Sequence, residues 1–154
     1  RGVEDYRPSR DIQEKVGSEA LLVCGEVDRE PISYVYLDMM EDRLMDGYQP
    51  DIVGHGYARW QEIETRLEDF GVRAQPHNFH NGNFGVRAAL IYGAASETFL
   101  TIEDERAAPN VYRPDEFTFE NGSYTVADTP GLGLEVDEDL FQRKYARNET
   151  RITL

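Results

Sequence analysis

Short apolar runs alternate with longer amphipathic segments over the first two thirds of the chain. Each short run has the composition of a strand buried on both faces, and each longer segment repeats its apolar residues at helical spacing. We expect strands at 20–24, 46–52, 72–75 and 98–102. We expect helices at 9–17, 32–45, 57–71 and 84–97.

One apolar face on each of the last three predicted helices indicates how that helix packs. Gly71 follows the third of them and suits a helix end, because glycine readily adopts the left-handed conformation found there. The expected faces are Val35, Met39, Met40 and Leu44; Trp60, Ile63, Leu67 and Phe70; and Val86, Leu90 and Ala94.

Alternating strands and helices predict an α/β fold with a parallel sheet. Two architectures remain open, a doubly wound open sheet and part of a (β/α)8 TIM-type barrel. A whole barrel takes about 250 residues, so we interpret residues 1–103 as half of one. A half-barrel alone would leave strand edges and an apolar interior exposed. The chain would therefore need its missing half, joined covalently or supplied as a partner chain.

Residues 104–154 have a different pattern and are predicted to form a second region. Asn121-Gly122 between short alternating runs is a strong hairpin signal, and "TPGLG" at 129–133 indicates a turn. The apolar residues of these runs are Phe117, Phe119, Tyr124 and Val126. We expect a small antiparallel piece here and not a further strand–helix unit.

The chain is strongly acidic, with 30 Asp and Glu against 16 Lys and Arg and a net charge of −14 over 154 residues. This charge argues against nucleic acid and anionic membranes as partners, because both attract positive surfaces. No apolar run reaches membrane-spanning length and no signal-peptide pattern opens the chain. We expect a soluble, cytoplasmic protein. An acidic substrate would need a local cation to enter this field, which makes a metal ion worth seeking.

Three reactive side chains have ordinary explanations. Cys24, the single cysteine, lies in an apolar run and is interpreted as a small buried hydrophobic residue in a reducing compartment. His55 and His80 lie in loops that could reach the mouth of a site, and we expect neither to be catalytic.

Four polar residues follow the expected strands, one for each strand–helix unit. They are Glu26, Asp51, His77 and Glu103, separated by 25, 26 and 26 residues. In a parallel barrel the carboxyl ends of all strands share one face, and that face carries the chemistry. The spacing therefore predicts that the four side chains converge on one site.

The residue types suggest proton transfer next to a carboxylate, with a metal stabilising the enediolate. Glu26 is a hard oxygen ligand suited to Mg²⁺, and His77 carries protons near neutral pH. Asp51 could hydrogen-bond the imidazole ring and orient it as a base. Glu103 could hydrogen-bond the substrate.

Each of these residues also has an ordinary explanation when taken alone. Asp51 suits a helix N-cap, and His77 suits a solvated or capping position in a polar loop. Glu103 could belong to a solvated acidic loop, and Glu26 to the charged first turn of a helix. Four such coincidences at regular strand ends are less persuasive than one site.

Five motifs, in order, resemble the C-terminal half of the enolase superfamily, in its mandelate racemase and sugar-acid dehydratase branch. The matching stretches are "VCGE", "YQPDIVGHGYARWQEI", "FGVRAQPHNF", "FLTIE" and "DTPGLGLEVDED". In that branch GE follows strand five, PD follows strand six, PH follows strand seven and Glu follows strand eight. A PGLG turn then returns the chain to an α+β capping domain. The resemblance covers nearly the whole chain.

The resemblance implies a role for each strand-end residue. Glu26 would be the third Mg²⁺ ligand, and Asp51 with His77 would form a dyad that acts as general base, or as acid toward a leaving hydroxyl. Glu103 would hydrogen-bond the substrate carboxylate and stabilise the enediolate. A His or Lys base with Mg²⁺ is the general pattern of this superfamily.

The family's other two metal ligands and its lysine motif follow strands two to four, which have no counterpart here. Most of the capping domain is also absent. We therefore expect this chain alone neither to bind Mg²⁺ tightly nor to turn over substrate.

Two classes of function follow from these observations. The first is a Mg²⁺-dependent acid-sugar dehydratase, a lyase that works with the missing N-terminal half and assembles as a homo-oligomer; a racemase or cycloisomerase would use the same face. The second is a non-catalytic partial domain or remnant. A third alternative, an unrelated open-sheet domain, lacks a Gly-rich phosphate loop after its first strand, where the sequence reads "GEVDRE".

Overall fold

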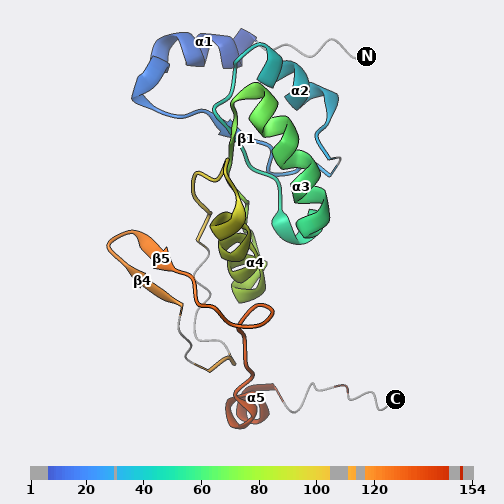
Figure 1. Cartoon of the computed structure of the whole chain (residues 1–154), viewed down its shortest axis with the longest axis vertical. Coiled ribbons are helices and arrows are strands. Elements are labelled where there is room, and N and C mark those ends of the chain that lie inside the picture. Colours follow the sequence, from blue (N-terminus) through green and yellow to red (C-terminus); the bar gives the residue numbers. More distant parts are fainter. Residues whose placement is uncertain (1–6, 30, 105–110, 114–116, 146–149, 151–154) are drawn as a thin grey trace. The chain divides into compact units, whose positions relative to one another are not determined.

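The computed structural model describes residues 7–29, 31–104, 111–113, 117–145 and 150. The chain divides into two compact units, Arg1–Arg106 and Ala107–Leu154 (Figure 1). In the described part of the chain, no helix is both long and apolar enough to cross a membrane.

A parallel sheet lies at the centre of the first unit, as the alternating pattern predicts. Strands β1 (Val23–Cys24), β2 (Gly47–Tyr48) and β3 (Arg73–Ala74) pair in the order β1-β2-β3. An isolated parallel bridge between Ala74 and Phe99 adds the fourth predicted segment beside β3. The α/β class with a parallel sheet is therefore confirmed.

The regular strands are shorter than the sequence pattern predicts, and 98–102 forms a bridge and no regular strand. Backbone pairing nevertheless continues beyond the strands. The Leu100 N–H donates to the Ala74 carbonyl at 2.9 Å, and the Glu103 N–H donates to the Pro76 carbonyl at 3.3 Å. Proline has no N–H to donate, so Pro50 and Pro76 interrupt the regular ladder just where the strands reach the cavity.

Four α-helices flank the strands in sequence, close to the predicted segments. They are α1 (Arg7–Val16), α2 (Tyr34–Glu41), α3 (Ile52–Phe70) and α4 (Gly82–Ala95), and a short 3-10 turn, η1 (Gly17–Glu19), follows α1. Helix α3 begins five residues earlier than predicted and is broken at Gly56, whose φ of 71° and ψ of 166° are not helical. Gly71 ends α3 with a φ of 69°, as expected of a left-handed cap.

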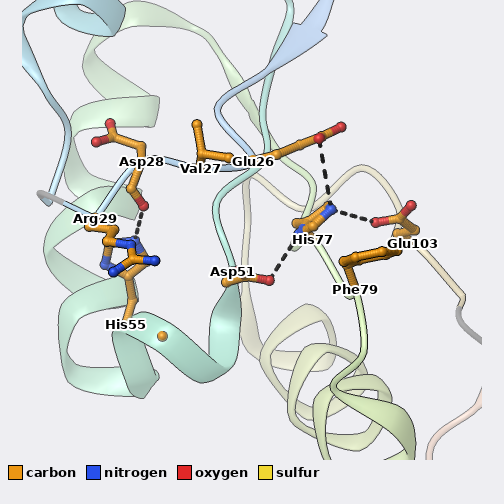
Figure 2. A pocket seen from close by; sticks show the side chains of 10 residues that line it. Glu26, Val27, Asp28, Arg29, Asp51, His55, His77, Phe79 and Glu103 are labelled. Carbon is orange, nitrogen blue, oxygen red and sulfur yellow. Dashed lines mark hydrogen bonds and ion pairs between the residues drawn. The ribbon is translucent and has the colours of Figure 1, made fainter.

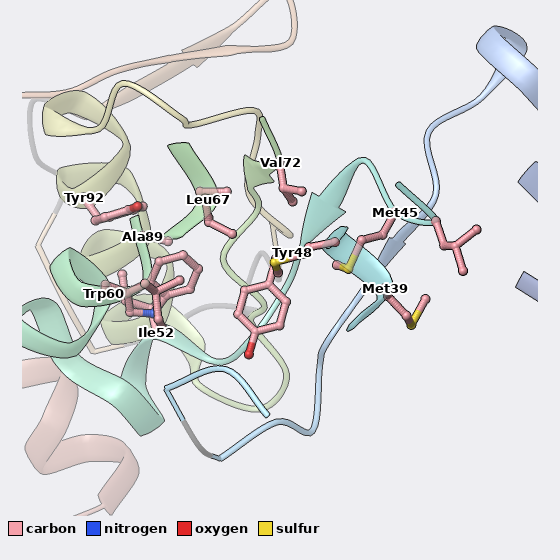
Figure 3. Packing of buried hydrophobic residues seen from close by; sticks show 13 residues of the cluster. Met39, Met45, Tyr48, Ile52, Trp60, Leu67, Val72, Ala89 and Tyr92 are labelled. Carbon is pink, nitrogen blue, oxygen red and sulfur yellow. The ribbon is translucent and has the colours of Figure 1, made fainter. Parts of the chain in front are cut away.

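The core lies between α2, α3, α4 and the sheet (Figure 3). Trp60, Ile63 and Leu67 of α3 are 0% exposed, as are Tyr48 and Ala74 of the sheet. These three α3 residues confirm most of the face predicted for that helix.

Two residues of the predicted faces are exposed, and Val35 is only half-buried. Phe70 is 37% exposed and Ala94 is also exposed, in contrast to the prediction. Both lie in the last turns of their helices, just before the chain returns to the sheet, and no described residue buries them.

The second unit is built from local turns. Strands β4 (Thr118–Glu120) and β5 (Ser123–Thr125) form the predicted antiparallel hairpin. Asn121 and Gly122 have φ angles of 51° and 81°, the pair of positive values that a tight hairpin turn of this length favours. A turn at 130–133 and helix α5 (Glu138–Tyr145) follow. None of its described residues is buried.

Candidate active site

A cavity of about 650 Å³ opens at the carboxyl ends of the strands in the first unit. Its volume lies in the range of small-molecule sites. All four predicted strand-end residues line it (Figure 2). The lining comprises Glu26, Val27, Asp28, Arg29, Asp51, Gly54, His55, His77, Phe79 and Glu103.

His77 lies at the centre of a group of carboxylates. Its Nδ1 is 2.9 Å from Asp51 Oδ1, and its Nε2 is 3.2 Å from Glu103 Oε2. Glu26 Oε2 lies 4.0 Å from the same Nε2. The His77 side chain is 11% exposed, whereas those of the three carboxylates are 40–57% exposed. The structure thus brings the four predicted residues together, with the imidazole as the least exposed of them.

Backbone pairing of neighbouring segments places the Asp–His pair. Asp51 and His77 form a parallel bridge, and the His77 N–H donates to the Pro50 carbonyl at 3.1 Å. The preceding residues, Pro50 and Pro76, are both fully buried. Because proline fixes its own φ angle, the approach of each side chain to the cavity is set by rigid backbone.

Asp51 occupies the N-cap position of α3 but does not cap it with its side chain. Its Oδ1 accepts hydrogen bonds from His77 Nδ1 and from Asn81 Nδ2, the latter at 3.2 Å. The carboxylate is therefore committed to the imidazole and not to the helix end. This observation removes the ordinary helix-capping explanation for Asp51.

Asn78 is a site residue that the sequence pattern did not reveal. It is 1% exposed, its backbone N–H donates to Glu103 Oε2 at 3.2 Å, and its Nδ2 donates to the Glu103 carbonyl at 3.1 Å. Asn78 therefore holds both the side chain and the backbone of Glu103. A single asparagine in a polar loop carries no distinctive sequence signal; its position directly after His77 is the one feature that points to the site.

The far side of the cavity is organised around Asp28. Its Oδ2 accepts hydrogen bonds from the Tyr48 hydroxyl at 2.6 Å and from the Ser33 N–H at 2.8 Å. Burial raises the pKa of Tyr48 and the bond to Asp28 raises it further, so the phenol stays protonated and donates. His55 Nε2 lies 2.9 Å from the Asp28 carbonyl.

The two loop histidines lie in different places. His55 lines the cavity, where its ring bonds to the backbone at Asp28. His80 is not part of the lining; its ring contacts that of Phe79 at a centroid distance of 4.1 Å.

A magnesium site is not complete in the described part of the chain. No group of three or more His, Cys, Asp or Glu side chains there has the arrangement to hold a metal ion. The described residues therefore do not fit the ion by themselves, although the 57% exposed Glu26 carboxylate has the oxygen chemistry of a single ligand.

Cys24 does not supplement this ligand set. It is half-buried, less buried than predicted, and lies within 4.0 Å of the Met45 sulfur. Burial raises its pKa to about 11, so without a metal ion the side chain is a thiol, and it does not line the cavity.

A parallel α/β unit with a histidine and carboxylates at its strand ends defines a recognisable class of protein. The chain belongs to the enolase C-terminal domain-like family, whose family model matches residues 7–140. This match confirms the resemblance to the enolase superfamily drawn from the motifs.

Solved structures of the mandelate racemase and dehydratase branch are similar to this chain. A mandelate racemase/muconate lactonizing protein from Geobacillus sp. Y412MC10, complexed with magnesium and tartrate, is 26% identical with a TM-score of 0.76 over 94% of this chain and 37% of its own. Galacturonate dehydratase from Geobacillus sp., complexed with D-galacturonate and 5-keto-4-deoxy-D-galacturonate, gives the same identity and TM-score over 94% and 39%.

Similarity in fold extends to more distant enzymes. The L-Ala-D/L-Glu epimerase of Bacillus subtilis is 16% identical with a TM-score of 0.61 over 76% of this chain and 33% of its own. The chain thus spans 33–39% of the length of these structures. No curated protein sequence matches it.

Proposed function

We propose that this chain supplies the second half of a (β/α)8 barrel in a Mg²⁺-dependent acid-sugar dehydratase. The carrying observation is the arrangement of His77 between Asp51 and Glu103 in one cavity. A galacturonate dehydratase among the similar structures supports the reaction class. The proposed substrate is a hydroxy acid that loses the proton next to its carboxylate and then a hydroxyl group, and so releases water.

His77 is the proposed proton carrier. Its Nδ1 is held by Asp51, which leaves Nε2 on the side of Glu26 and Glu103. In a neutral imidazole one ring nitrogen is a donor and the other an acceptor, so a proton on Nδ1 leaves Nε2 able to accept one. Nε2 would take the substrate proton and later return a proton to the departing hydroxyl.

Glu103 is the proposed partner of the substrate carboxylate. Its Oε2 accepts from the Asn78 N–H and lies 3.2 Å from His77 Nε2, so it is held beside the nitrogen that moves the proton. In its protonated form, a group fixed in this way can donate a hydrogen bond to the negative charge that develops on the substrate, without rearranging.

Glu26 would supply one oxygen ligand for Mg²⁺, and the N-terminal half of the barrel would supply the others. Magnesium, when bound, would stabilise negative charge that develops on the substrate carboxylate. Magnesium in a similar solved structure supports this assignment. Glu26→Gln should weaken Mg²⁺ affinity in titration calorimetry of the complete protein, meaning this chain together with the strands that close the barrel. Unchanged affinity would remove Glu26 from the site.

The alternative for the isolated chain is a non-catalytic domain. The incomplete metal site in the described residues favours this alternative when no barrel-closing partner is present. A racemase or cycloisomerase remains the alternative within the superfamily, because both reactions would use the same face of the barrel.

Product analysis separates these functions. The complete protein is incubated with Mg²⁺ and a panel of aldonic and aldaric acids, and the products are followed by mass spectrometry and NMR. Loss of one water with formation of a keto-deoxy acid supports the dehydratase, and inversion or cyclisation without water loss supports the alternative enzymes. Turnover of no acid by the complete protein, compared with its His77→Asn variant as baseline, would support the non-catalytic domain.

A further inference from the structure

The cavity has a second polar end that the proposed proton transfer does not use. Figure 2 shows Arg29 and His55 on one side of Asp51, and His77 with Glu103 on the other. All five residues line the same cavity. A substrate that fills this cavity would therefore meet both groups.

Arg29 differs in charge from the rest of the lining. Among the described lining residues it is the one Lys or Arg, while four others are acidic. No ion pair joins Arg29 to another described residue. Its guanidinium keeps its charge throughout the physiological pH range and can bind a carboxylate through two parallel hydrogen bonds. In a chain of net charge −14, this cation is suited to attract an anionic group into the cavity.

The loop that carries Arg29 is held in place by the residue before it. The Asp28 side chain accepts hydrogen bonds from Tyr48 and Ser33, and the Asp28 backbone N–H donates to the Gly25 carbonyl at 3.0 Å. These bonds tie the Asp28 side chain to β2 and to the start of α2, and its backbone to Gly25. A binding group on a pre-positioned backbone loses less freedom when it engages a ligand.

His55 adds a bond from the neighbouring element. His55 belongs to the first turn of α3, and its Nε2 donates to the Asp28 carbonyl at 2.9 Å. The break at Gly56 follows immediately, with a φ and ψ that glycine alone adopts readily. This break separates the first turn of α3, which ends at His55, from the rest of the helix. The first turn can therefore point the His55 ring toward the loop that carries Arg29.

Resting on the proposed function, we propose that Arg29 binds a second carboxylate at the far end of the substrate, so that the site selects aldaric acids over aldonic acids. His55 is a positioning residue in this proposal: it acts through Asp28 and touches no substrate. An aldaric acid carries a carboxylate at each end, whereas an aldonic acid of the same configuration ends in a neutral hydroxymethyl group. The two acids therefore differ only where Arg29 would act.

Binding without turnover tests this proposal directly. The complete protein with His77→Asn is titrated calorimetrically, in Mg²⁺, with a six-carbon aldaric acid and the aldonic acid of the same configuration. The diacid should bind roughly tenfold or more tightly, the ratio expected of a charge-assisted hydrogen bond. Adding Arg29→Gln should bring the two affinities together, and Arg29→Lys should restore part of the ratio because it keeps the charge but not the planar fork.

Arg59→Gln is the matched control, because Arg59 is an exposed arginine that pairs with Glu62 on α3. This change should leave the affinity ratio of the two acids unchanged. His55→Ala should also lower the affinity ratio, but by less than Arg29→Gln does. A general loss of folding would leave the ratio unchanged, because misfolding weakens the binding of both acids alike.

Equal affinities for the two acids in His77→Asn, or a ratio that survives Arg29→Gln, would overturn the assignment of Arg29. Turnover of acid sugars by the protein with His77 intact would in that case still support the dehydratase. Absence of turnover together with an Arg29-dependent affinity ratio would instead keep the diacid site and reject the dehydratase.

Discussion

In the first unit the core and the cavity lie three residues apart along the same strands, yet different interactions hold their side chains in place. Tyr48 and Ala74 are 0% exposed within the core, and Asp51 and His77 follow them in the cavity. The core consists mainly of apolar contacts, whereas the cavity consists of polar groups held by hydrogen bonds. Stability and activity should therefore be separable by mutation.

His77→Asn should produce the largest separation. In the complete protein we expect turnover to fall by about 10²–10⁴-fold, the usual contribution of a positioned general base, because asparagine cannot carry the proton. The midpoint of urea unfolding should change little, since the ring contacts carboxylates and not the core. His80→Asn, in a residue that does not line the cavity, is the control. Near wild-type turnover in His77→Asn would remove this residue from the mechanism.

Trp60→Ala should have the opposite profile. Removing a fully buried aromatic residue costs about 3–5 kcal/mol of unfolding free energy through lost contacts and the resulting cavity. Urea unfolding measures this loss. Trp60→Phe is the control and should cost much less, because the buried indole N–H has no hydrogen-bond partner among the described residues to lose. Equal losses in the two variants would show that the indole is needed for more than its volume.

Asn78→Ala tests the boundary between the two regions, because Asn78 is buried and yet bonded to Glu103. Leaving the Glu103 carbonyl without its side-chain donor should cost about 1–3 kcal/mol of stability. Turnover should fall as well, mainly in kcat, because Glu103 would lose its fixed position beside His77. A loss of stability with kcat and KM both unchanged would make Asn78 a structural residue alone.

Glu64→Gln should have the smallest effect and a characteristic pH dependence. Burial tends to raise the pKa of Glu64, but bonds from Ser96, Thr98 and Tyr92 outweigh burial and lower the pKa below its ordinary value of 4.5. A lowered folded-state pKa stabilises the fold above the unfolded-state value, and that stability is lost as the pH falls through the folded-state pKa. The variant should be less stable by about 1 kcal/mol at neutral pH.

This difference should shrink as the pH falls below the ordinary carboxyl value, where the wild-type carboxylate also becomes protonated. Urea unfolding at a series of pH values would show the convergence. Glu62→Gln is a suitable control, because Glu62 is an exposed partner of Arg59 and touches no strand-end backbone. A difference between Glu64→Gln and wild type that stays constant down to low pH would contradict the stated cause.

The sequence pattern predicted the order of strands and helices because burial on two faces and burial on one face leave different periodicities. It also predicted that Glu26, Asp51, His77 and Glu103 lie close together, since parallel strands end on one side. It could not predict the single bridge at Phe99, because regular pairing depends on neighbours and not on the segment alone. The contacts of Asn78 and His55 and the place of Arg29 in the cavity were likewise hidden, since they depend on loop geometry, including the break at Gly56.

The one-residue-per-unit arrangement of the site has a consequence for how such a protein can change. Glu26, Asp51, His77 and Glu103 each arrive on a separate strand–helix segment of nearly equal length. Replacing one segment by its counterpart from a relative would exchange one chemical group and leave the other three in place. The fold is thus suited to stepwise recombination, in which new reactions arise by trading whole segments.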